Sequence, residues 1–479
     1  MKEISRRSFI KATAVGVGAL AARRPFSKVL GANGDIRVGV VGFHGQGGNH
    51  IENFLAMPGV RLVALCDVDE RVLNKMAHVL EKQNVKVAKY TDVRKLLEND
   101  EVDAISIATP NHWHSLITIW ACQAGKDVYV EKPCSHNVYE GRKAVEAARK
   151  YKRIVQHGTQ NRSSSDWARQ IAAVQSGKYG KLLVSKGYCC KPRWSIRYKR
   201  IKEPPDPLHF DLWLGPAPEQ PYHGNLVHYN WHWFWDTGNG DIGNQGVHEM
   251  DLARWAIKDA TLPKSVVSMG GRWVNGRDFS DQGETPNMLL SVFDYGETLL
   301  VFETRGLVGK RFRRTYPRKV TVEFYLEEGV IRDGKFYPKG SDKPEPLIDV
   351  DPGIHPNGPF GNFIDCVRSR NQDELNADIL KGHYSSALCH LGNISYRVGE
   401  EVPFEERPKV FTQNHIVSDS METVLANTQA LGVTPGRDTY RLGPKLAFDG
   451  ETEQFVDNGR ANELLTRDYR APFVVPERV

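Results

Sequence analysis

The chain has 479 residues, of which 40% are hydrophobic and 25% are charged, a balance typical of folded globular proteins and unlike that of disordered chains. No apolar run reaches the ~18 residues that a membrane-spanning helix requires, which excludes a multispan membrane protein. The seven cysteines form no CxxC pair, and their odd number argues against a disulfide framework. The net charge of +6 comes entirely from the first 32 residues, so the neutral remainder is a poor candidate for nucleic-acid binding, which requires neutralisation of phosphates.

Residues 1–32 have the composition of an export signal. The run Ser5-Arg6-Arg7-Ser8-Phe9-Ile10-Lys11 precedes a short, weakly apolar stretch of small residues. The arginine pair followed by Phe9 resembles the twin-arginine export motif, with Ile10 in place of the usual leucine. A disordered basic N-terminus is the alternative interpretation. We therefore predict a periplasmic or exported protein that uses the twin-arginine pathway.

The segment from Ile36 to Asp67 predicts a dinucleotide-binding unit. The apolar run Ile36–Val41 indicates a strand buried on both faces of a parallel sheet, and a glycine-rich turn, a helix over 50–57 and a second strand over 61–66 follow it. A glycine turn lets the backbone approach a pyrophosphate, and an acidic residue after the second strand accepts hydrogen bonds from a ribose. The predicted cofactor ligands are Gly42, His44, Gly45, Gln46, Gly47 and Asp67. His44 replaces the second glycine of the usual fingerprint, so a purely structural glycine turn is the alternative.

The alternation of strands and helices continues to residue 160. We expect strands over 85–90, 104–108, 127–130 and 154–156, separated by helices near 70–82, 92–99, 112–124 and 138–151. This order predicts a Rossmann-type, doubly wound parallel sheet over residues 35–160. Because ligands bind beyond the carboxyl ends of such strands, functional residues are expected at 42–48, 67–69, 109–114, 131–134 and 157–161.

Two of those segments resemble a known family. The runs Ile107-Ala108-Thr109-Pro110-Asn111-His112-Trp113-His114 and Glu131-Lys132-Pro133 are similar, in order and spacing, to those of the Gfo/Idh/MocA family of NAD(P)-dependent sugar and cyclitol oxidoreductases. The resemblance covers roughly residues 35–400 and implies that Lys132 lies beside the nicotinamide and the substrate. It also implies that further cofactor ligands are Thr109, Asn111, His114, Glu131 and Gln160, and we expect Asn161 and Arg162 to contact the substrate.

The second half of the chain predicts an α+β domain, residues 161–400, built on an open and mostly antiparallel sheet. Strands are expected over 184–190, 264–274, 287–294, 298–304, 320–326 and 330–332, and a helix over 376–398. The resemblance implies that this sheet carries the substrate pocket and joins subunits into a homo-oligomer. Residues 401–479 form a C-terminal extension, which either wraps the substrate domain or completes an oligomer contact.

One predicted helix, entered from Gly238, carries the residues most suited to proton transfer. Asn244 and His248 are four positions apart and share a helix face, with Asp251 a further three positions on. Dehydrogenases of the resembled family have aspartate and histidine at the first two positions. Because an amide cannot take up a proton at neutral pH, Asn244 weakens the usual relay and leaves His248 to act alone or with Lys132.

Four tryptophans cluster between residues 213 and 235, with histidines between them. Core packing is one interpretation, and stacking of a sugar on Trp231, Trp233 or Trp235 is the sharper one. The spacing of the histidines does not favour a metal site, so no metal is predicted.

Three functions remain open at this stage. The first is an NAD-dependent oxidoreductase that acts on a secondary hydroxyl of a sugar or cyclitol. The second is an NAD-dependent glycosidase or lyase that works by transient oxidation at C3, and the third is a nucleotide-binding protein without activity. We favour the first, with a tightly bound cofactor and a small carbohydrate as its partner. NAD is preferred to NADP because Asp67 is followed by Val68, Asp69 and Glu70 and by no adjacent arginine.

Overall fold

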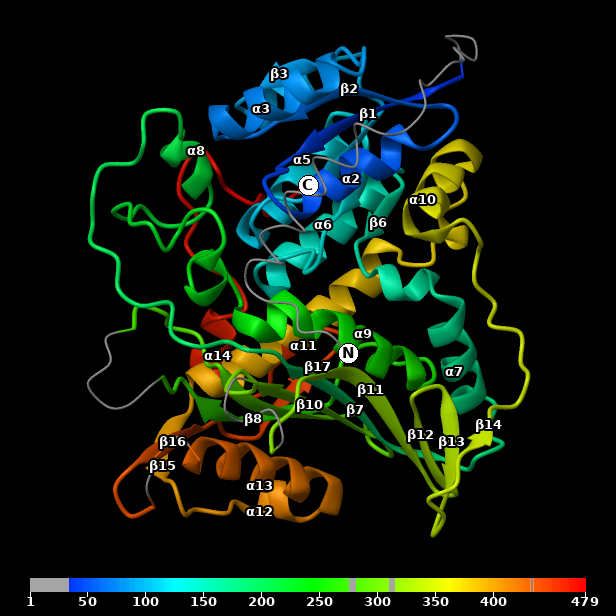
Figure 1. The fold of residues 1–479 in the computed structure, drawn as a ribbon, viewed down its shortest axis with the longest axis vertical. Helices are drawn as coiled ribbons and strands as arrows, with labels where there is room; N and C mark the ends of the chain where they lie inside the picture. The colour runs from blue at the N-terminus through cyan, green and yellow to red at the C-terminus, as the bar shows by residue number, and fades with distance from the viewer. Residues whose placement is uncertain (1–33, 275–280, 310–314, 431, 434) are drawn as a thin grey trace.

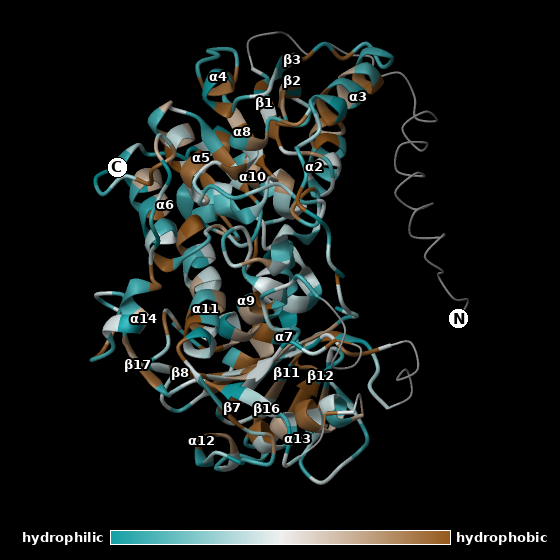
Figure 2. Cartoon of the chain, turned by 90° about the vertical axis from the view of Figure 1, so that its left-hand side faces the viewer, coloured by the Kyte–Doolittle hydropathy of each residue, from teal (hydrophilic) through white to brown (hydrophobic). Residues whose placement is uncertain are grey.

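The computed structural model describes residues 34–274, 281–309, 315–430, 432–433 and 435–479, and the predicted export signal over 1–32 lies outside them. The described chain forms two sheets, of six and 12 strands. Figures 1 and 2 show the first sheet at one end of the molecule and the second at the other, with helices α9 (Val247–Ala256) and α11 (Ile379–Arg397) between them. Among the described residues, no helix combines the length and the apolar character that crossing a membrane requires.

The first sheet confirms the predicted doubly wound fold. All its pairings are parallel, and its order is β3-β2-β1-β4-β5-β6. Its strands are β1 Ile36–Val41, β2 Val60–Cys66, β3 Ala88–Tyr90, β4 Ala104–Ile107, β5 Asp127–Val130 and β6 Val155–His157. Its helices are α2 Gln46–Leu55, α3 Glu70–Glu81, α4 Val93–Leu97, α5 His114–Gln123 and α6 Val138–Lys150. Both faces of the sheet are covered by helices, which explains the continuous apolar runs of β1, β4 and β5.

The second sheet is mixed and mostly antiparallel, as predicted, with β10 and β7 as its parallel pair. Its hydrogen-bonded order is β14-β13-β12-β11-β7-β10-β9-β8-β16-β15, with β17 also paired to β8. The strands are β7 Leu182–Cys190, β8 Ser265–Gly271, β9 Met288–Asp294, β10 Leu299–Arg305, β11 Lys319–Leu326, β12 Gly329–Arg332, β13 Lys335–Pro338, β14 Glu345–Pro346, β15 Glu400–Pro403, β16 Thr439–Leu442, β17 Leu446–Asp449 and β18 Gln454–Phe455.

Helices cover both faces of this second sheet. The face toward the first domain packs against α9 (Val247–Ala256) and α11 (Ile379–Arg397), where Phe302 and Phe324 are fully buried. The opposite face packs against α13 (His415–Gln429), whose Met421 and Leu425 contact Val292 and its neighbours. The other helices are α7 Ser165–Gln175, α8 Phe210–Leu214, α10 Gly358–Ser369, α12 Lys409–Thr412 and α14 Gly459–Glu463.

The C-terminal extension does not form a separate layer. Its strands β15, β16 and β17 join the second sheet, and α13 covers part of the outer face. The last residues then return to the first domain, where Phe473 and Val475 enter the core and the Phe473 ring meets Trp113 at 5.4 Å. Residues 401–479 therefore tie the two sheets together, which the sequence left open.

Candidate active site

The turn after β1 is shaped for close approach of a ligand to the backbone. Gly42 has φ +74°, and a Cβ there would lie 2.9 Å from Thr109. A Cβ at Gly47 would lie 2.0 Å from the Gly42 carbonyl oxygen, so glycine is required at both positions. Gly45 has open space around it and caps α2 without a side chain, which leaves the first N–H groups of this helix available to an anion. The neighbouring His44 and Gln46 are exposed at the same turn.

Asp67 ends β2 beside this turn. Its carboxylate accepts hydrogen bonds from the Phe43 N–H at 3.1 Å and the Asp69 N–H at 3.0 Å. Burial raises the pKa of Asp67 to about 6. The His44 ring stacks on His228 at 4.1 Å, and His228 Nε2 lies 3.0 Å from Asp69. His228 belongs to the segment before α9. The second domain therefore reaches the predicted ribose site, a contact that no sequence pattern indicated.

The segment after β4 is held by internal bonds. Asn111 donates to Asn239 at 2.5 Å, and the ring nitrogens of His114 lie 2.6 Å from the Pro133 carbonyl and 2.8 Å from the Thr109 carbonyl. Thr109 differs, because its buried hydroxyl has no partner. Three features at one edge of the sheet fit a bound dinucleotide. They are an unpartnered hydroxyl, an open helix N-terminus and an acidic residue placed to bind a ribose.

Glu131 lies at the centre of a buried network at the carboxyl end of β5. His50 Nε2 is 3.1 Å from its Oε1, and Gln160 donates to the same oxygen at 2.8 Å. Burial opposes the charge of this carboxylate, but the hydrogen bond and charge of His50 and the charge of Lys132 outweigh it and lower the pKa of Glu131 to about 2. Sequence reasoning missed His50, whose only signal is a polar side chain on the buried face of α2.

Lys132 follows Glu131 and reaches across to the second domain. Its Nζ donates to the main-chain oxygen of Asn244 at 2.6 Å. Burial lowers the pKa of Lys132, and the charge of Glu131 opposes that shift. A lysine with a lowered pKa takes up and releases protons more readily near neutrality.

Asn244 and His248 do not lie on one uninterrupted α-helix. Asn244 belongs to a π-helical turn, Ile242–Gly246, and His248 to the first turn of α9. Burial and the charge of Lys132 lower the pKa of His248 to about 3, so the imidazole is neutral at pH 7. Asp251 is fully buried and pairs with Arg162 at 2.9 Å.

Arg162 and the tryptophans have partners within the protein. Arg162 is 4% exposed, and its ion pair with Asp251 holds α9 against the turn after β6. Asn161 precedes Arg162 in that turn. Trp233 is buried beside Arg193, Trp235 lies 5.0 Å from the Arg397 guanidinium, and Trp231 stacks on His232 at 3.5 Å. Contact of these residues with a substrate stays a prediction. In the described part of the chain, no group of three metal-ligating side chains comes together.

Several side chains around the same π-helical turn were not among the site residues predicted from the sequence. Lys191, just after β7, donates to Gln245 Oε1 at 2.8 Å, and Gln245 donates to Glu249 at 3.0 Å. Beside them, Arg193 and Asp241 form an ion pair at 2.9 Å. None of these residues stands in a recognisable motif, because β7 and α9 meet only in the folded chain.

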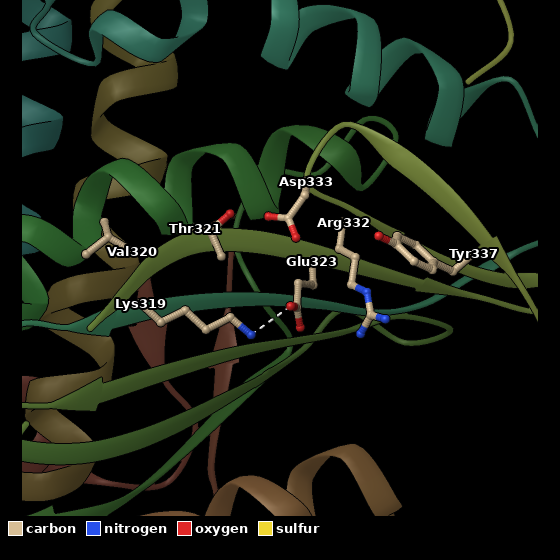
Figure 3. A pocket seen from close by; sticks show the side chains of 7 residues that line it. All are labelled: Lys319, Val320, Thr321, Glu323, Arg332, Asp333 and Tyr337. Carbon is tan, nitrogen blue, oxygen red and sulfur yellow. Dashed lines mark hydrogen bonds and ion pairs between the residues drawn. The ribbon is translucent and has the colours of Figure 1, made fainter. Parts of the chain in front are cut away.

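A separate pocket of about 500 Å³ lies on β11, β12 and β13 (Figure 3). Lys319 and Glu323 form an ion pair there at 2.7 Å, with Arg332 and Tyr337 on the adjoining strands. None of the predicted site residues lines it, so this pocket is not part of the candidate active site.

Two family models match the chain. Residues 36–159 match the Gfo/Idh/MocA model described as "oxidoreductase family, NAD-binding Rossmann fold". Residues 173–271 match the model of the C-terminal alpha/beta domain of the same oxidoreductase family.

Curated relatives match over part of their length. A glycosyl hydrolase family 109 protein of Solibacter usitatus is 36% identical over 154 residues, which are 29% of this chain and 35% of that protein. An alpha-N-acetylgalactosaminidase of Shewanella oneidensis is 28% identical over 172 residues, which are 34% of this chain and 37% of that protein. The matches thus span little more than a third of the length of these relatives.

Solved structures of dehydrogenases share the fold. The WlbA dehydrogenase of Bordetella pertussis, in complex with NADH and UDP-GlcNAcA, has a TM-score of 0.55 at 18% identity and covers 76% of this chain and 97% of its own. The myo-inositol dehydrogenase of Lactobacillus casei, in complex with NAD(H) and myo-inositol, has a TM-score of 0.51 at 15% identity, with coverage of 76% and 95%. At these identities the likeness shows the fold alone.

Proposed function

Because the chain carries the NAD-binding Rossmann domain and the C-terminal domain of the Gfo/Idh/MocA oxidoreductases, we propose that it transfers hydride to or from a secondary hydroxyl of a sugar or cyclitol. The observation that carries the proposal is Lys132 Nζ, which lies 2.6 Å from the Asn244 carbonyl where the two domains meet. When bound, NAD supplies the hydride acceptor or donor. Gly42, Gly47 and Asp67 would hold its dinucleotide end.

The proton of the substrate hydroxyl falls to this chain's own residues. Lys132, with its lowered pKa, is suited to exchange it, and His248, whose pKa of about 3 keeps it neutral and makes it the weaker base, can hydrogen-bond to the hydroxyl. The Asn244 carbonyl orients the Lys132 ammonium, and Glu131 contributes a fixed negative charge beside it. Positioning of such groups typically contributes about 100- to 10,000-fold to a rate.

A redox-neutral glycosidase is the second candidate, and two observations favour it. Asn244 stands where a proton-accepting aspartate is expected, and the curated relatives include family 109 glycosyl hydrolases. In this reaction, oxidation at C3 acidifies the C2 proton, elimination expels the aglycone, water adds and the hydride is returned. The protein would then turn over without net consumption of its cofactor.

One experiment distinguishes the two candidates. Native mass spectrometry and absorbance of the purified protein report whether NAD accompanies it and in which oxidation state. The protein is then incubated in heavy water with an aryl glycoside and, separately, with free sugars and added NAD. Stoichiometric NADH from a free sugar supports the oxidoreductase. Aglycone release with deuterium at C2 and no net NADH supports the glycosidase, and the absence of both reactions contradicts both.

We also propose export through the twin-arginine pathway, supported by the arginine pair near the N-terminus. That pathway carries folded proteins, so a cofactor would be bound before transport.

Homo-oligomerisation is likewise a proposal. The outer face of the second sheet over β11 to β13, which bears the pocket of Figure 3, is the surface we assign to it. Fractionation of cells and sedimentation of the purified protein test the two proposals separately.

A further inference from the structure

Two ammonium groups converge on adjacent residues of the π-helical turn. Lys132 Nζ donates to the Asn244 carbonyl oxygen at 2.6 Å, and Lys191 Nζ donates to Gln245 Oε1 at 2.8 Å. After burial, the charge of Lys191 is among the contributions that lower the pKa of Lys132. The two cations are therefore close enough to repel one another, and both are held by neutral oxygens.

The carboxylates around this turn already have other partners or no charge. Asp241 is 1% exposed and pairs with Arg193 at 2.9 Å. Glu249 is 4% exposed and accepts a hydrogen bond from Gln245, and burial raises its pKa to about 8, which keeps it largely neutral at neutral pH. Glu131 is bonded by His50 and Gln160. Among the described residues, no carboxylate lies within ion-pair distance of Lys132 or Lys191.

Glu131 contributes a negative charge beside Lys132, but within the described chain Lys191 has no charged carboxylate as a partner, so this half-buried ammonium implies a ligand that supplies one. We propose that the substrate is an anionic sugar, with a carboxylate close to the reacting hydroxyl, as in a uronic acid or its glycoside. The inference rests on the proposed function and names its substrate class. Lys132 is assigned to the reacting hydroxyl, so Lys191 determines the specificity. Its ammonium would exchange a neutral amide oxygen for a carboxylate, which adds an attraction between opposite charges.

The test compares matched sugars on the NAD-loaded protein. Glucose is paired with glucuronate and galactose with galacturonate, each as free sugar and as aryl glycoside, and glucose 6-phosphate reports whether a phosphate replaces the carboxylate. Turnover is followed by nicotinamide absorbance and aglycone release, and binding by calorimetry. We expect kcat/KM to be about 10-fold or more higher for the acid of each pair, as a hydrogen bond to a charged group allows. Preference for the phosphate over both acids would overturn the assignment of a carboxylate.

Variants at Lys191 test the residue. Lys191→Met should remove the preference for the acid, and Lys191→Arg should retain most of it. Lys95→Met, at an exposed position of α4, is the control and should leave the preference unchanged. An unchanged preference in Lys191→Met would contradict the proposal.

Failure of this inference is distinguishable from failure of the proposed function. Equal or better turnover of neutral sugars in the unaltered protein overturns the anionic substrate and leaves the oxidoreductase standing. Calorimetric binding of glucuronate, lost in Lys191→Met, with neither NADH formation nor aglycone release, supports the anionic site and contradicts the proposed chemistry.

Discussion

The two halves of the candidate active site are built differently. On the cofactor side, Glu131 is bonded to His50 and Gln160, and Asp67 accepts from two backbone N–H groups. On the substrate side, Lys132 and Lys191 meet only neutral oxygens, and no hydrogen-bond partner of the His248 ring is found among the described residues. The carboxylates of the first half are thus satisfied internally, whereas the second half retains charged and proton-exchanging groups that a ligand can bind.

This contrast predicts which substitutions lower the stability of the protein and which lower its turnover. A buried charge with complete partners contributes to a rigid framework, and removing one partner is costly. A charge held by neutral oxygens contributes less to folding and more to the binding of an anion or a proton. Substitutions in the first half should therefore affect folding, and substitutions in the second should affect turnover.

Lys132→Met should have the largest effect. Turnover should fall by about 100- to 10,000-fold, because a positioned proton-transfer group is lost, while NAD remains bound. Lys126→Met is a matched control, since this lysine flanks the opposite end of β5 and its Nζ also donates to a carbonyl, that of Asn99, at 2.9 Å. Steady-state kinetics and NAD retention are measured for both. Near-normal turnover in Lys132→Met would contradict its assigned role.

His50→Ala should destabilise the protein by about 3–5 kcal/mol, because it leaves the Glu131 carboxylate buried with fewer partners. The folded pKa of Glu131 is lowered to about 2 from an ordinary 4.5, so its stabilising contribution is complete above pH 4.5 and is lost as the pH falls toward 2. The difference between the two proteins should therefore shrink across that range. Denaturant unfolding at several pH values measures it.

The control for this experiment is His78→Ala. The imidazole of His78 is exposed beside Glu81 on α3, so its loss should change stability by less than about 1 kcal/mol. An effect of His50→Ala no larger than that of the control would show that the cofactor half does not depend on this pair.

Asp67→Asn should weaken NAD binding by about 10-fold or more, since a hydrogen bond to a charged acceptor is replaced by a neutral one. It should also narrow the preference for NAD over NADP. The pKa of Asp67 is raised to about 6, so NAD affinity in the unaltered protein should fall as the pH drops through 6, and the variant should lack this dependence. Titration of nicotinamide fluorescence tests both effects. Equal affinity of the unaltered protein for NAD and NADP would refute the cofactor assignment.

Asn244→Asp leaves the main-chain oxygen that holds Lys132 unchanged, but it replaces an amide that donates to Asp241 Oδ1 at 3.5 Å with a carboxylate, beside the Arg193–Asp241 ion pair. It adds a proton acceptor to the substrate half. We expect the ratio of net NADH formation to aglycone release to rise, as measured with an aryl glycoside in heavy water. An unchanged ratio would mean that Asn244 does not decide between the two reactions.

The sequence predicted the six-stranded parallel sheet and the edge on which the site lies. Strands of alternating βα units place their carboxyl ends together, so Gly42, Asp67, Thr109 and Glu131 were expected at one edge before any coordinates were known. Through the resemblance to a family, the sequence also predicted that Lys132 and His248 belong to the same active site. These inferences depend on local patterns, which short segments carry by themselves.

Other features were decided by the tertiary structure. Three features join residues that lie far apart or in irregular segments: the π-helical turn that precedes α9, the approach of Lys191 to Gln245 and the stacking of His228 on His44. The return of Phe473 to the first domain is a contact of the same kind. Hydrophobic periodicity predicts which face of an element is buried, but it does not specify which distant side chain packs there. The fold class and the strands of the parallel sheet were therefore readable from the sequence, whereas the charge balance of the substrate site emerged only when β7 and α9 were packed together.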